Sequence, residues 1–93
     1  MARKLLGIDI GTGGTRAVLI DETGRVLGSA TAEHQPISAP HRGWAEQEPD
    51  DWWAAACKAV PQCLTNAKAT ADEVESVGLT GQMHGLVMLD ADG

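Results

Sequence analysis

The sequence predicts an α/β fold in which an antiparallel meander of three strands is followed by a helix and then a further strand, all in one mixed sheet. Three apolar runs at 4–10, 15–21 and 25–32 are separated by short glycine-containing turns, which is typical of hairpins. From position 49 onward, apolar residues recur at the spacing of an amphipathic helix. A later apolar run at 77–80 predicts a fourth strand.

The length and composition describe one small globular unit. Its 93 residues are 43% hydrophobic and carry a net charge of −6, which argues against a nucleic-acid-binding surface. No apolar run approaches the length of a membrane span, and the first four residues lead straight into a strand with no signal-peptide pattern. We therefore expect a cytoplasmic protein with no membrane or nucleic-acid partner.

The first three strands are expected at Lys4–Ile10, Thr15–Asp21 and Arg25–Ala32, with a turn at Asp21–Gly24. A loop from Glu33 to Gln47 then interrupts the pattern with two prolines and a glycine. Long loops of this kind are usually functional or mobile. Within it, Trp44 fits either a lid over the sheet or one wall of a substrate cleft.

A helix is expected to begin at Pro49, because proline suits the first helical position. The apolar face expected toward the sheet consists of Trp53, Ala56, Cys57, Val60 and Leu64. Pro61 removes a helical hydrogen bond at a cost of about 3 kcal/mol, so we expect a kink or an early end nearby. Cys57 and Cys63 lie too far apart along the helix for a disulfide, and we expect two free thiols facing the core.

Beyond the helix, Thr70 and Glu73 form a capping-box pattern that opens a short helical turn. It leads to a central strand at 77–80 and a further strand at 86–89. The last residues, Asp90–Gly93, have the composition of a hairpin turn with no second strand behind it. We therefore expect residues 1–93 to be the N-terminal part of the first domain of a longer protein.

Glycines, hydroxyl side chains and one cation gather between the first two strands, directly after a carboxylate. Glycine lets bare backbone approach a ligand, and successive N–H groups in such a turn bind anions. The carboxylate of Asp9 would repel a phosphate unless a hard cation such as Mg²⁺ lay between them. We predict a site for a polyphosphate and its metal, with an ordinary glycine-rich hairpin turn as the alternative. Its candidate residues are Asp9 for the metal and Gly11, Thr12, Gly13, Gly14, Thr15 and Arg16 for the phosphates.

Two other phosphate-binding motifs are excluded. A P-loop needs a lysine after its glycines, and none is present. A Rossmann fingerprint needs a third glycine where Arg16 stands, followed by a helix, whereas the apolar run 17–20 predicts a strand.

A second polar cluster, Gln82, Met83 and His84, lies between two glycines at the end of the expected central strand. An amide and an imidazole can donate and accept hydrogen bonds with a polyol, and a thioether supplies an adaptable apolar wall. The cluster therefore predicts a sugar-type site at the sheet edge. The alternatives are purely structural roles for Met83 and His84, or a catalytic base at His84.

The run 7–16 resembles the first phosphate-binding motif of the actin, sugar-kinase and heat-shock ATPase superfamily. The segments 44–49 and 78–85 resemble the FGGY carbohydrate kinases, and xylulokinases most closely, with Gln-Met-His-Gly the most specific element. The resemblance extends over essentially the whole chain. It implies a ribonuclease-H-like fold and the phosphorylation of D-xylulose to D-xylulose 5-phosphate with ATP and Mg²⁺ as cofactors.

Carried over residue by residue, the resemblance implies that Asp9 helps to position Mg²⁺ as a catalytic residue. Thr12, Gly13, Gly14 and Arg16 would contact the ATP phosphates, and Gln82, Met83 and His84 would meet the sugar. Gly13 and Gly14 replace hydroxyl residues of some family members, so backbone amides would do that part of the binding.

The family's general base, an aspartate, and its adenosine-binding glycines lie further along than this chain extends. The resemblance therefore implies that residues 1–93 alone are inactive, and it favours sugar binding over proton abstraction for His84. The alternatives are a kinase for another ketose or polyol, or a non-kinase ATPase or sensor of the same superfamily. A homodimer of the full-length protein is a further open alternative.

Overall fold

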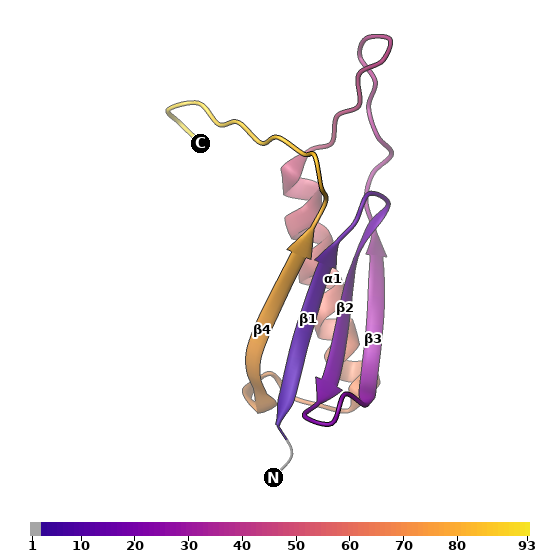
Figure 1. The fold of residues 1–93 in the computed structure, drawn as a ribbon, viewed down its shortest axis with the longest axis vertical. Coiled ribbons are helices and arrows are strands. Elements are labelled where there is room, and N and C mark those ends of the chain that lie inside the picture. The colour runs from indigo at the N-terminus through magenta and orange to yellow at the C-terminus, as the bar shows by residue number, and fades with distance from the viewer. Residues whose placement is uncertain (1–2) are drawn as a thin grey trace.

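The computed structural model describes residues 3–93 as one four-stranded sheet with a long helix across one face (Figure 1). The elements are β1 (Lys4–Ile10), β2 (Gly14–Asp21), β3 (Val26–Glu33), α1 (Pro49–Ala67), a single 3₁₀ turn at Ala71–Glu73 and β4 (Val74–Gly81). The strand order is β3-β2-β1-β4. Strands β1 to β3 pair antiparallel, and β4 runs parallel to β1. The predicted mixed sheet, with a meander followed by helix and strand, is confirmed.

The core lies between α1 and one face of the β1–β2 hairpin. Leu6 is paired with Leu19 in register, and both are buried under the helix. The helix packs mainly against β2 and β3, touches β1 slightly, and leaves β4 uncovered. Because side chains alternate along a strand, the residues between these core positions face the opposite side of the sheet.

The buried face of α1 matches the predicted one in part, since Val60 and Leu64 pack against the core as expected. Ala55, Ala59 and Cys63 are buried, whereas Trp53 is 74% exposed and Cys57 is also exposed. The helix lies so close to β3 that a Cβ atom added at Gly28 would stand 2.7 Å from a backbone nitrogen of α1. The small side chain of Ala67 permits this approach. Burial raises the pKa of the Cys63 thiol, and neither cysteine forms a disulfide.

The early end expected at Pro61 does not occur, because α1 continues to Ala67. Both Pro61 and Cys57, whose carbonyl loses its helical donor, lie on the exposed side of the helix. Water can reach that carbonyl, which lowers the cost of the missing bond. The predicted capping pattern is confirmed, since the Glu73 carboxylate accepts the Thr70 backbone N–H at 2.9 Å.

The C-terminal segment departs from the prediction in two ways. The strand expected at 86–89 is absent, and residues 82–93 extend away from the sheet as irregular chain (Figure 1). Strand β4, expected in the centre, is an edge strand within residues 3–93. Both differences have one cause, because no strand in the described chain is available to pair beyond β4. The expected Asp90–Gly93 turn does form, with the Gly93 N–H 3.1 Å from the Asp90 carbonyl.

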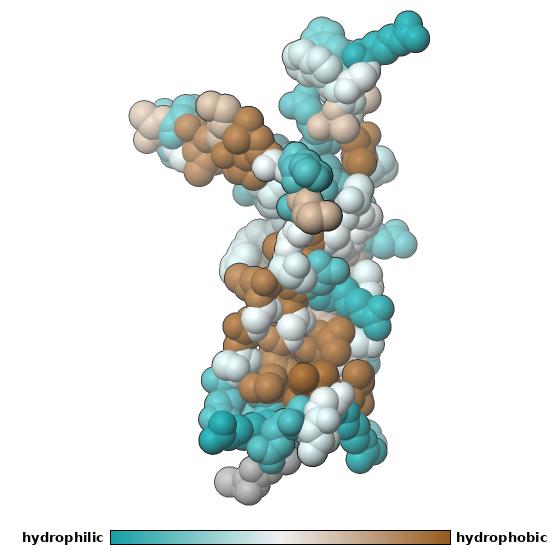
Figure 2. All heavy atoms as spheres, viewed as in Figure 1, coloured by the Kyte–Doolittle hydropathy of each residue, from teal (hydrophilic) through white to brown (hydrophobic). Residues whose placement is uncertain are grey.

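The sheet face opposite α1 has an apolar surface in its lower half (Figure 2). Leu5, Val18 and Ile20 line a shallow groove of about 370 Å³ there, together with Ser76 of β4. A parallel strand pair is usually covered on both faces. Here the β1–β4 pair presents this apolar face without a cover from within residues 3–93. No helix in this described part of the chain is long and apolar enough to cross a membrane.

Candidate functional site

The turn between β1 and β2 is closed by its own backbone and held from outside through its carbonyl groups. The Gly11 N–H donates to the Gly14 carbonyl at 2.9 Å. The Thr12 carbonyl accepts Gln47 Nε2 at 2.6 Å, and the Gly13 carbonyl accepts the His34 N–H at 2.9 Å. Within residues 3–93, the N–H groups of Thr12 and Gly13 have no acceptor. With carbonyls satisfied and amides free, the turn suits an anion.

Asp9 and Arg16 stand opposite each other at the upper end of the hairpin. They are register partners on β1 and β2, both are exposed, and their sheet face is the one opposite α1. In the described part of the chain, neither forms a salt bridge. A free carboxylate and a free guanidinium beside an anion-binding turn are therefore available to a metal–phosphate group.

The residues at this turn suit a Mg²⁺ ion that is bound partly by substrate. They do not suit an ion that is bound by protein side chains alone. Across residues 3–93, no group of three or more histidine, cysteine or acidic side chains could hold a metal ion. Mg²⁺ commonly binds through one or two carboxylates, with waters and substrate phosphates completing its shell. One carboxylate, that of Asp9, next to a phosphate-type turn meets this requirement.

Thr15 occupies a different place from the other turn residues. Its side chain is fully buried on the helix side of β2, and its hydroxyl lies 2.7 Å from His34 Nε2. The other ring nitrogen of His34 is 3.4 Å from the Thr12 carbonyl. A phosphate contact by the Thr15 hydroxyl stays a prediction. In this structure the hydroxyl is bonded to His34, and that bond stabilises the turn from the helix side of the sheet.

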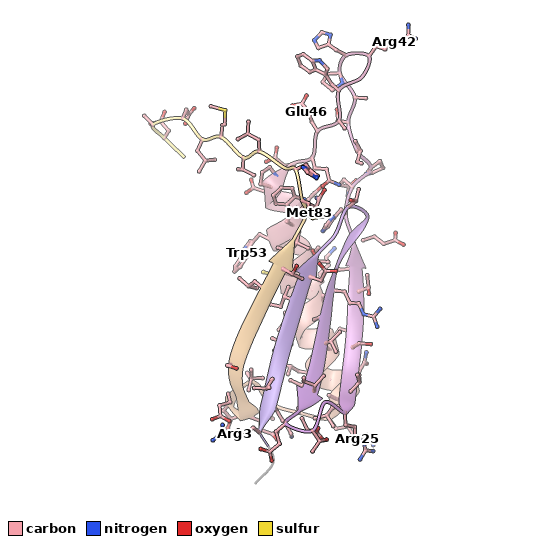
Figure 3. All side chains as sticks on the ribbon, viewed as in Figure 1. Arg3, Arg25, Arg42, Glu46, Trp53 and Met83 are labelled. Carbon is pink, nitrogen blue, oxygen red and sulfur yellow. The ribbon has the colours of Figure 1, made fainter. Side chains whose placement is uncertain are left out.

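The sheet topology brings the second predicted segment to this turn. In the parallel β1–β4 ladder Ile10 is paired with Gly81, so Gln82 follows beside Gly11. The Gln82 amide nitrogen is 3.4 Å from the Gly11 carbonyl, and the Thr12 hydroxyl is 3.4 Å from the Gln82 amide oxygen. Figure 3 shows Met83 at the end of β4, next to the hairpin turn.

A cavity of about 760 Å³ opens between this segment and the loop before α1. That volume is within the range of small-molecule sites. Gln82 and His84 line it, while Met83 is 83% exposed and lies outside the lining. His84 adopts a φ of 60°, in the left-handed region that few non-glycine residues occupy. Strained backbone of this kind gathers at binding sites.

The tryptophan expected over the sheet or in the cleft is in neither place. Trp44 is 56% exposed and meets His41 edge-to-face at 4.4 Å between ring centroids. It lies in the projecting loop whose arms meet at the Ser38–Glu46 bridge. Trp52 lines the cavity instead, and its indole N–H donates to Gln47 at 3.1 Å.

Two residues that hold the site, Gln47 and His34, were not singled out by sequence reasoning. Gln47 lies in the segment 44–49, which carried part of the family resemblance, and that was the available signal. Nothing in the sequence indicated a role for His34, because the loop around it shows no hydrophobic periodicity. Its contact with Thr15 arises where β3 ends beside the turn.

A mixed sheet of this topology, an antiparallel meander followed by a helix and a strand parallel to β1, is a ribonuclease-H-like fold. Residues 4–93 match the FGGY family of carbohydrate kinases, N-terminal domain. The chain therefore belongs to this family.

Similar proteins include kinases for two substrates. The xylulose kinase of Escherichia coli strain K12 is 41% identical over 86 residues, which are 92% of this chain and 17% of that protein. A glycerol kinase of Clavibacter michiganensis subsp. michiganensis is 35% identical over 88 residues, 95% of this chain and 17% of that protein. The crystal structure of a xyloylose kinase from Brucella ovis has a TM-score of 0.85 and 39% identity, over 97% of this chain and 18% of that chain.

The fold class inferred from the sequence is confirmed by these likenesses. The chain spans only 17% of the length of the xylulose kinases of Escherichia coli and Klebsiella pneumoniae that it matches.

Proposed function

We propose that this chain is the N-terminal part of the first domain of a longer kinase that transfers the γ-phosphate of ATP to D-xylulose. The observation that carries the proposal is the contact between the two segments. A turn whose Thr12 and Gly13 amides are free within residues 3–93 lies beside a strand end that carries Gln82 and His84 and borders a cavity. A phosphate donor and a sugar acceptor would be brought together at this place.

Each residue has a separate task in this proposal. The amides of Thr12 and Gly13 and the guanidinium of Arg16 bind phosphate oxygens. Asp9 holds Mg²⁺, which when bound neutralises charge on the phosphates. Such positioning and charge neutralisation supply most of the catalysis in phosphoryl transfer.

The sugar is held by the Gln82 amide, the Met83 thioether and the His84 imidazole. One sugar hydroxyl oxygen forms the new bond to the γ-phosphorus, the bond from that phosphorus to ADP breaks, and the hydroxyl proton passes to a base outside this chain. We therefore expect no transfer by residues 1–93 alone. The proposal places the kinase in the cytoplasm and leaves a homodimer open.

A polyol or another ketose is the second candidate substrate, favoured by the 35% identity to a glycerol kinase. The test is a panel of D-xylulose, D-ribulose and glycerol with ATP and Mg²⁺ on the full-length protein. We expect D-xylulose to give the highest kcat/KM and ADP release to depend on sugar. A preference for glycerol would select the second candidate. ATP turnover indifferent to every sugar would favour a non-kinase ATPase.

A further inference from the structure

One glutamine outside both predicted segments lies between them. Gln47 Oε1 accepts Gln82 Nε2 at 2.8 Å and Trp52 Nε1 at 3.1 Å. Its Nε2 donates to the Thr12 carbonyl at 2.6 Å. A single amide therefore connects the phosphate-type turn, the end of β4 and the first turn of α1.

The backbone that carries this amide is itself anchored. Just before it, Ser38 and Glu46 exchange two backbone hydrogen bonds at 2.8 and 2.9 Å across the loop. Just after it, α1 begins at Pro49. Figure 3 shows Glu46 at the lower part of the projecting loop, above the end of the sheet. Gln47 is half-buried, and its side chain has its orientation determined by three partners at once.

We infer that Gln47 is a positioning residue. It sets the separation between the turn 11–14, called the phosphate turn, and residues 82–84, called the sugar segment. The inference rests on the proposed function, since that assigns one substrate to each segment. Phosphoryl transfer requires the attacking and leaving oxygens in line, and small displacements of one substrate lower the rate strongly. Gln47 acts through the Thr12 carbonyl on one side and the Gln82 amide on the other.

The three hydrogen bonds can be separated by substitution. Gln47→Leu removes all three. Gln47→Glu keeps an oxygen to accept from Gln82 and Trp52 but replaces the donor to Thr12 by a second oxygen facing a carbonyl. The two variants therefore loosen different sets of contacts.

The test is steady-state kinetics of the full-length protein with sugar and ATP varied separately. Since each lost neutral hydrogen bond is worth up to about tenfold, we expect Gln47→Leu to raise the KM values of both substrates by about tenfold. Gln47→Glu should raise the ATP KM and leave the sugar KM within about twofold. His84→Ala, by contrast, should raise the sugar KM alone.

A matched control is Gln35→Leu, on the same loop. The Gln35 side chain is exposed, and within residues 3–93 it makes no hydrogen bond. Both KM values should stay unchanged in this variant. Equal behaviour of Gln47→Leu and Gln35→Leu would overturn the inference, and so would identical KM changes in Gln47→Leu and Gln47→Glu.

A failure of the proposed function is distinguishable from a failure of this inference. If the wild-type full-length protein phosphorylates no sugar, the proposed function is wrong. The contact between Gln47 and the turn is then tested by measuring the amide hydrogen-exchange rates of residues 11–14. Faster exchange there in Gln47→Leu than in Gln35→Leu supports the positioning role, and equal exchange overturns it.

Discussion

The β1–β2 hairpin and strand β4 lie side by side in one sheet, yet the chain supports them very differently. Leu6 on β1 is 6% exposed, whereas Val77, its register partner on β4, is 54% exposed. The difference arises because α1 lies across β2 and β3 and still covers Leu6 on β1, but does not extend over β4 at Val77. Hydrophobic burial by this chain therefore stabilises the hairpin and, on β4, the first residue Val74, while the exposed remainder of β4 depends on its backbone ladder.

The two halves of the candidate site, the β1–β2 turn and the segment after β4, are positioned by different forces. The β1–β2 turn is the end of a hairpin anchored in the core through Thr15, Ala17 and Leu19. The segment Gln82–His84 is placed by the β1–β4 ladder and by polar side-chain bonds of Gln82. A substitution in the core should therefore disturb the turn more than the segment. A substitution that removes a polar contact should disturb the segment more than the turn.

The largest effect is expected at the chemical end of the hairpin. Asp9→Ala in the full-length protein removes the carboxylate proposed for Mg²⁺, and metal stabilisation of the transition state is worth several kcal/mol, so kcat should fall roughly a hundredfold or more. The measurement is kcat at saturating ATP, Mg²⁺ and sugar. Glu22→Ala, in the turn between β2 and β3, is the control, and a kcat near wild type for Asp9→Ala would refute the metal role.

The difference in packing predicts a difference between two glycines. A Cβ atom at Gly28 would stand 2.7 Å from the Ala67 nitrogen, whereas one at Gly78 meets nothing within 4 Å. Gly28→Ala should therefore lower the free energy of unfolding of this chain by about 1–3 kcal/mol, because α1 must move off β3. Gly78→Ala should change it by less than about 0.5 kcal/mol. Equal changes in the free energy of unfolding, measured by urea denaturation, would contradict this difference in packing.

A smaller effect is expected beneath the turn. Thr15→Val deletes the hydroxyl that meets His34 and leaves a half-buried ring nitrogen without that partner, at a cost of about 1 kcal/mol. Thermal unfolding of the full-length protein measures this loss. The ATP KM should rise while the sugar KM stays constant. Thr31→Val, at an exposed position of β3, is the matched control, and a larger rise in the sugar KM would contradict the assignment.

The smallest effect is expected where β1 and β4 begin. A hydrogen bond from the Lys4 ammonium, with further bonds from Thr70, lowers the pKa of Glu73 from 4.5 to about 2. A depressed carboxyl pKa stabilises the folded state above the unfolded value, and this contribution is lost as pH falls from 4.5 toward about 2. The Glu73 side chain is 39% exposed, so solvent screening keeps the contribution small.

Thermal unfolding of Glu73→Gln between pH 6 and pH 2 tests this contribution. The variant should be less stable than wild type at pH 6, and the two curves should converge at the acidic end. A constant difference across the whole range would show that ionisation of Glu73 does not matter.

Much of the fold could be read from local pattern. Hydrophobic period and turn chemistry predicted β1, β2 and β3 within a residue or so, the start of α1 at Pro49 and the capping box at Thr70. These features depend on neighbours in sequence, which explains the success. The expected strand at 86–89 was wrong because apolar residues alone do not form a strand without a pairing partner. The predicted face of α1 was right at Val60 and Leu64 and wrong at Trp53 and Cys57, because hydrophobic period alone does not say which side of the helix the sheet covers.

Local order along the chain was enough to place a carboxylate, a glycine-rich turn and an arginine together, and to group Gln82, Met83 and His84 in a second polar cluster. Tertiary structure decided that the two meet, since the parallel β1–β4 ladder sets Gln82 beside Gly11. It also assigned Thr15 to the core and Gln47 to the space between the segments. The physical reason is that hydrogen bonds between residues 35 or more positions apart depend on strand register and helix placement, and no local pattern encodes either.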